Sequence, residues 1–173
     1  MAQQTPQEVI KRYLQDAIAA EELFERQLRQ FAQDQPQDGV IKQIFLQHAD
    51  ETKQQRERLE QRLRALGGSP SGFKSFMAGI FGQGPRLMQL GHEPSERVTQ
   101  DLFMAFAVEQ AEVAMYEAMM VAAELAGDTE TAALARDIQQ QERATAQKVW
   151  DQIRPQAEYS FRAVTGQAIP RAA

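Results

Sequence analysis

Residues 105–116 read AFAVEQAEVAMY, and this stretch places two glutamates on the inward face of a helix. Glu109 follows Ala105 by four residues, and Glu112 precedes Tyr116 by four. Residues three or four apart share one face of an α-helix, so both glutamates lie on the face that the apolar residues define. The stretch therefore predicts a helix that carries carboxylates into a protein core.

Three other segments repeat this pattern, in which a polar side chain interrupts an apolar stripe of helical spacing. In the first, Glu21 follows Ala17 by four residues and precedes Phe24 by three. The inward polar residues of the other two are His48 and Glu51, with Gln55 one turn further on, and Glu142. Each lies near the middle of its segment, so we expect them at one height in the folded protein.

The apolar periodicity predicts four long helices, at residues of about 6–32, 40–66, 95–126 and 129–153. Thr5-Pro6-Gln7-Glu8 is a capping box with proline at the first helical position, and Gly67-Gly68 is typical of a helix end. Pro155 is expected to end the last helix. The tail, residues 154–173, would then hold a short helix around Tyr159 and Phe161.

The lengths of the connections predict the topology. The first and last connections are short, so each pair of helices should form an antiparallel hairpin. The middle connection, residues 67–94, is long enough to run beside a helix of roughly 40 Å. These features predict an all-α, ferritin-like, up-down four-helix bundle that forms one domain, residues 1–173. Phe73, Phe76 and Phe81 suggest a short helix in this middle connection, the crossover. The crossover could instead be a mobile lid or a surface for dimerisation.

The composition supports this class and excludes several functions. The chain has 173 residues, with 26 Ala and 25 Gln against 16 Val plus Ile, which favours helices over strands. It has no Cys and two His, so any metal site must consist mostly of carboxylates. A net charge of −5 argues against nucleic-acid binding. We expect no membrane association and a cytoplasmic location, since neither a long apolar run nor a signal peptide is visible.

Five carboxylates and one imidazole cannot share a dry core as free ions. Two divalent cations would remove most of the repulsion, and iron or manganese suits such ligands, with zinc as a further choice. The predicted metal ligands are Glu21, His48, Glu51, Glu109, Glu112 and Glu142. We expect one ion at Glu21, His48 and Glu51, a bridge through Glu109 or Glu112, and the second ion at Glu142. Tyr13, Tyr116 and Gln55 are candidates for a supporting role beside the ligands.

The segments 48–52 (HADET), 108–116 (VEQAEVAMY) and 142–145 (ERAT), with Ala20-Glu21 and Leu66-Gly67, resemble the YciE/YciF-type ferritin-like family. The resemblance covers about residues 10–153. It implies a ferritin-like bundle, dimerisation and an association with bacterial stress responses. The chain departs from the family pattern at Ala146, where relatives often carry an acid, and in its Phe- and Gly-rich crossover.

Two functions of different class remain open. One is a di-metal protein that reacts iron with oxygen or peroxide as a ferroxidase or a peroxide-consuming enzyme. The other is a non-enzymatic dimeric stress or scaffold protein, with a vestigial or structural metal site. In a metal-free form, the acids would pair with Arg62, His48 or Gln55. Whether the protein is an enzyme is not decided by the sequence, and a homodimer is the expected assembly.

Overall fold

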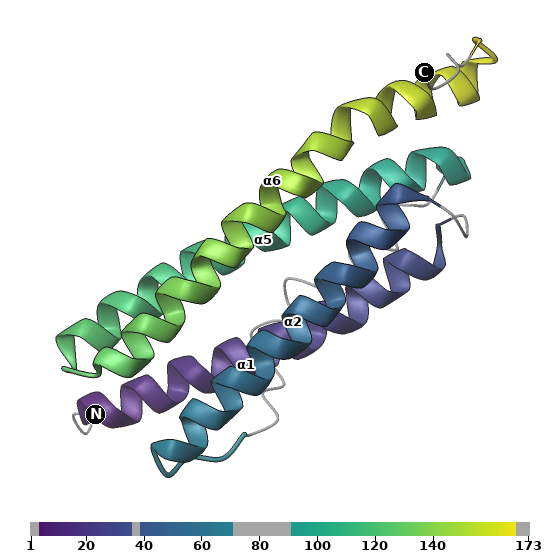
Figure 1. The fold of residues 1–173 in the computed structure, drawn as a ribbon. Coiled ribbons are helices and arrows are strands. Elements are labelled where there is room, and N and C mark those ends of the chain that lie inside the picture. The colour runs from purple at the N-terminus through teal and green to yellow at the C-terminus, as the bar shows by residue number, and fades with distance from the viewer. Residues whose placement is uncertain (1–3, 36–38, 71–90, 169–173) are drawn as a thin grey trace.

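The computed structural model describes residues 4–35, 39–70 and 91–168. The helices in these ranges are α1 (Pro6–Gln33), α2 (Val40–Ala65), α5 (Pro94–Leu125) and α6 (Thr129–Thr165). α1 packs along α2 and α5 packs along α6, and the two antiparallel hairpins lie side by side (Figure 1). The predicted all-α four-helix bundle is therefore confirmed. Within these ranges, none of the helices combines the length and apolar character that a membrane crossing requires.

Local signals place the helix ends. The Thr5 hydroxyl accepts a hydrogen bond from the backbone N–H of Glu8, whose side chain accepts one from the backbone N–H of Thr5. This reciprocal capping box starts α1 as the sequence predicts. Gly127, with φ of +71°, makes the turn after α5, and the Asp128 side chain caps α6 by accepting from the Thr131 N–H. The predicted helix within residues 67–94 falls mostly on residues 71–90, outside the described ranges.

The prediction that Pro155 ends the last helix, and that a separate short helix follows, is wrong. α6 continues through Pro155 as far as Thr165 and ends at Gly166, which has φ of +69°. Proline removes one helical hydrogen bond, but contacts with the start of α5 hold the extension in place. The Ser160 hydroxyl donates to the Ser95 carbonyl at 2.6 Å, and Gln156 Nε2 donates to the same oxygen at 3.1 Å. Tertiary bonds of this kind have no local sequence signal.

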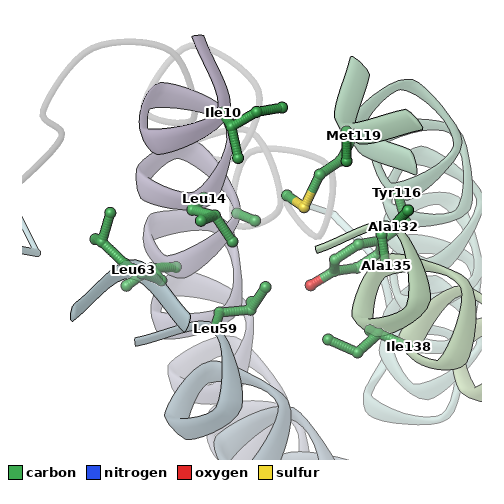
Figure 2. Packing of buried hydrophobic residues seen from close by; sticks show 12 residues of the cluster. Ile10, Leu14, Leu59, Leu63, Tyr116, Met119, Ala132, Ala135 and Ile138 are labelled. Carbon is green, nitrogen blue, oxygen red and sulfur yellow. The ribbon is translucent and has the colours of Figure 1, made fainter. Parts of the chain in front are cut away.

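The core consists of two apolar clusters at different heights in the bundle. The first cluster includes Leu14 of α1, Leu59 of α2, Met119 of α5 and Ile138 of α6. In it, side chains of the α1–α2 hairpin face those of the α5–α6 hairpin (Figure 2). The second cluster is built around aromatic and aliphatic residues, including Phe24, Phe31, Phe45, Leu102 and Val149. On α1, α5 and α6, the predicted site residues lie along the chain between residues of the first cluster and residues of the second.

Candidate metal centre

A layer of buried polar side chains separates the two apolar clusters. We call this set the polar layer: Glu21 of α1, His48 of α2, Glu109 and Glu112 of α5, and Glu142 of α6. Each of these residues is at most 2% exposed. The structure therefore buries five of the six predicted metal ligands at mid-height in the bundle.

The tightest group in the polar layer is His48 with Glu109 and Glu142. One ligand atom of each residue lies within 4.8 Å of the other two, a spacing that one metal ion can bridge. His48 Nε2 is 2.9 Å from Glu109 Oε1 and 3.8 Å from Glu142 Oε2. Neither nitrogen of His48 has a partner in hydrogen-bond geometry among the described residues. The expected grouping of His48 with Glu21 and Glu51 differs from this arrangement, because His48 points across the bundle to α5 and α6.

Glu21 lies on α1 and Glu112 on α5, two helices of different hairpins that pack against each other. The Tyr116 hydroxyl donates a hydrogen bond to Glu21 Oε1, and both side chains are fully buried. The other Glu21 oxygen and both oxygens of Glu112 have no hydrogen-bond partner in the described part of the chain. Tyr116 therefore fixes the orientation of Glu21 and leaves its second oxygen available for a ligand.

The remaining predicted residues lie at the edge of the site or away from it. Glu51 is half-buried, and it contacts Gln47, Thr145 and Lys148 rather than the His48 group. Gln55 is buried, with Nε2 donating to Gln141 Oε1 at 3.1 Å.

Two more residues that the sequence singled out lie elsewhere. Tyr13 packs against the first apolar cluster. Of the three partners expected in a metal-free form, Arg62 is wrong, because it binds Asp128 and Glu130 at the α5–α6 turn. Gln55 donates to Gln141 rather than to a site acid, whereas His48 Nε2 lies 2.9 Å from Glu109 Oε1.

Burial makes the polar layer electrostatically unfavourable without a cation. The pKa of Glu109 is raised well above 4.5, first by burial and then by the charge of Glu142. Burial likewise raises the pKa of Glu112, with the charge of Glu21 as the next cause. The pKa of Glu21 also rises through burial and the Glu142 charge, although the Tyr116 hydrogen bond acts in the opposite direction. Without a cation, the ionised carboxylates are therefore destabilised by repulsion between their charges and by the absence of water.

The donor set fits a divalent metal. Buried polar atoms without partners are rare in folded proteins, yet both oxygens of Glu109, Glu112 and Glu142 are in this state within the described residues. Carboxylate oxygens with one imidazole are the ligands that suit iron, manganese and zinc. The buried His48, Glu109 and Glu142 group could thus hold a metal ion.

The sequence did not identify two groups that surround Glu51. Gln47 lies one turn before Glu51 on α2, and its Nε2 donates to Glu51 Oε1 at 2.8 Å, a pair that i,i+4 spacing could have indicated. Lys148 reaches Glu51 from α6, with its Nζ 4.0 Å from Oε1. No local pattern predicts a contact between residues almost 100 positions apart.

Three solved structures are similar to this chain over most of its length. A solved structure from Xanthomonas campestris is 27% identical, with a TM-score of 0.76 over 92% of this chain and 98% of that chain. YcfI of Rhodopseudomonas palustris is 24% identical, with a TM-score of 0.75 over 84% and 93% of the two chains. The Escherichia coli stress protein YciF is 24% identical, with a TM-score of 0.79 over 90% and 99%.

The family comparison covers most of the chain. No curated protein matches it. The family model DUF892, described as a domain of unknown function, matches residues 5–159, which include all six predicted ligands. The chain therefore belongs to the DUF892 family.

Proposed function

We propose that the protein is a di-metal carboxylate protein that binds two divalent ions, iron or manganese, in the polar layer. The observation that carries this proposal is a set of buried carboxylate oxygens, on Glu21, Glu109, Glu112 and Glu142, that have no hydrogen-bond partner among the described residues. Without a cation, the chain would have to protonate most of these groups or leave their charges unpaired in the core, because the single imidazole of His48, 2.9 Å from Glu109 Oε1, cannot neutralise four carboxylates. Four buried carboxylates balance the charge of two divalent cations.

The first ion would be held by His48, Glu109 and Glu142, whose ligand atoms are already gathered. The second would lie at Glu21 and Glu112, with Glu109 near enough to interact electrostatically with both. Tyr116 orients Glu21 through its hydroxyl. The apolar clusters on either side of the layer keep water away from the ions.

A redox-active metal such as iron, when bound, would supply the electrons for a reaction with oxygen or peroxide. The chain itself would supply fixed ligand geometry and a dry environment. The likeness to the Escherichia coli stress protein YciF supports a role in stress protection. We therefore propose ferroxidase or peroxide-consuming activity for the metal-loaded protein.

Metal analysis tests the proposal. Protein loaded with Fe(II) without air and then desalted should retain about two metal ions per chain. Glu109→Ala should abolish this binding, because Glu109 lies in the His48 group and next to the second site. Glu124→Ala is the matched control on α5, since Glu124 is exposed and pairs with Arg136. Wild-type protein that retains no metal after loading would overturn the proposal.

A second candidate is a non-enzymatic scaffold that pairs with a second copy of this chain, and the outer face of α5 favours it. Positions spaced by three and four residues form an outward stripe without a charged residue: Phe103, Ala107, Gln110, Ala114, Ala118, Val121 and Leu125. Such stripes usually pack against another helix. If the α5 helices of two copies crossed antiparallel, alanines would lie at the centre of the contact and larger side chains at both of its ends. Full metal loading without oxygen consumption on exposure to air, together with a dimer mass in solution, would favour this candidate.

A further inference from the structure

Glu51 differs from every other predicted ligand in its contact with water. Its side chain is 32% exposed, whereas Glu21, His48, Glu109, Glu112 and Glu142 are at most 2% exposed. It lies on α2 one turn after His48, so one helix carries both a buried ligand and a half-buried carboxylate. Glu51 is therefore the predicted ligand that water and a hydrated ion can reach.

Weak contacts hold the Glu51 carboxylate at the surface between α2 and α6. Oε1 accepts a hydrogen bond from Gln47 Nε2 at 2.8 Å and lies 4.0 Å from Lys148 Nζ. Oε2 accepts from the Thr145 hydroxyl at 3.4 Å. Half of the Lys148 side chain is exposed, and ion pairs in contact with solvent contribute little to stability. A divalent cation can therefore displace Lys148 from this carboxylate.

Glu51 is also within electrostatic reach of the buried ligands. Burial and the charge of Glu142 are the larger causes of the raised pKa of Glu109, and the charge of Glu51 adds to them. Thr145, which donates to Glu51, is buried and follows Glu142 by three residues on α6, so both lie on the same face. A cation on Glu51 would thus lie close to the buried group of His48, Glu109 and Glu142, which offers it more ligand atoms than Glu51 does.

Apolar side chains line other directions around the buried group. The Phe24 ring packs edge-on against the His48 ring, with 5.1 Å between centroids. The two apolar clusters lie above and below the layer along the bundle axis. An ion moving along the axis would have to lose its water among leucine and phenylalanine side chains, at a high cost.

We propose that Glu51 is the capture ligand of the metal centre. It binds a divalent cation at the surface between α2 and α6 and transfers it to His48, Glu109 and Glu142, while Lys148 opposes capture by competing for the same carboxylate. This inference rests on the proposed metal binding, and it assigns to Glu51 a role in the rate of binding. A residue that lowers only the energy barrier between the free and the bound metal ion must change the association and dissociation rates in the same direction.

The test is stopped-flow binding of Co(II), followed by its visible absorption, with dissociation measured by transfer to a chelator. Glu51→Gln should slow association by about tenfold, the lower end of electrostatic effects on association rates, and should also slow dissociation. Lys148→Gln should speed association, and this effect should vanish at 1 M salt, where the screening length is about 3 Å. Glu57→Gln and Lys53→Gln are matched controls, because this exposed pair lies on α2 beyond the site.

The outcomes separate this inference from the proposed function. Normal equilibrium binding of Co(II) with an unchanged association rate in Glu51→Gln would overturn the capture role alone. Faster dissociation in Glu51→Gln would also overturn it, because that result identifies a resident ligand. A wild-type protein that binds no Co(II) at equilibrium would overturn both the proposed function and the capture role.

Discussion

The first apolar cluster and the polar layer are equally buried, but burial has opposite energetic consequences in them. Leu14 and Leu59 are 0% exposed and surrounded by other apolar side chains, so their removal from water stabilises the fold. Glu109 and Glu112 are at most 2% exposed, and their carboxylate oxygens have no hydrogen-bond partner in the described residues. The comparison shows that the polar layer does not stabilise the metal-free chain.

A bundle can tolerate such a layer because the apolar clusters on either side compensate for it. Native proteins are stable by only about 5–15 kcal/mol, and each unpartnered buried polar group costs roughly 1–3 kcal/mol. Several of them in one layer use a large fraction of that stability. Sites of this kind are retained when a ligand supplies the missing interactions, and a cation does so for carboxylates.

Truncation in the apolar cluster should have the largest effect. Leu14→Ala removes buried methyl groups and leaves a cavity between the hairpins, so we expect a loss of about 2–5 kcal/mol in the free energy of unfolding. Urea denaturation, with and without metal, measures it, and the loss should be similar in both conditions. Val40→Ala is the control, because Val40 is 67% exposed. An equal loss in the control would contradict the role of the cluster.

Replacement of a carboxylate in the polar layer should raise the free energy of unfolding instead of lowering it. Glu112→Leu removes a buried carboxylate that has no hydrogen-bond partner in the described ranges and fills its space with an apolar side chain. We expect the metal-free variant to gain about 1–3 kcal/mol in the free energy of unfolding and to retain less metal. Glu22→Leu is the matched control on the exposed side of α1, where the change should stay within about 0.5 kcal/mol. A loss of stability in metal-free Glu112→Leu would contradict the comparison.

Most of the fold could be predicted from the sequence, because its determinants are local. The capping box at Thr5, the turn at Gly127 and the periodic apolar stripes are each encoded within a few residues. The extension of α6 through Pro155 could not be predicted in this way. It depends on Ser160 and Gln156 reaching Ser95, more than 60 residues earlier in the chain.

The composition of the site could be predicted better than its geometry. The face and height of Glu21, His48, Glu109, Glu112 and Glu142 follow from helical spacing. Which of them meet depends on how the two hairpins are rotated against each other, and spacing within one helix does not determine that rotation. Consequently the sequence placed His48 with Glu21, whereas the structure places it with Glu109 and Glu142.

A third test is the dependence of metal-free stability on pH, which probes the same carboxylates without a substitution. Burial raises the pKa of Glu21, Glu109 and Glu112 above their ordinary value of 4.5, so the folded chain holds protons that the unfolded chain releases above that pH. Each such group should lower the free energy of unfolding by about 1.4 kcal/mol per pH unit, from pH 4.5 up to its raised pKa.

Urea denaturation of chelator-treated protein between pH 4.5 and 7 measures this slope. Leu14→Ala should keep it, because that change removes no titrating group, whereas Glu112→Leu should make it shallower. With bound metal the slope from these carboxylates should disappear, because the cation keeps them ionised in the folded chain, as they already are in the unfolded chain above pH 4.5. A metal-free stability that rises over this pH range would show that the layer already satisfies its charges, and the contrast between layer and cluster would then be wrong.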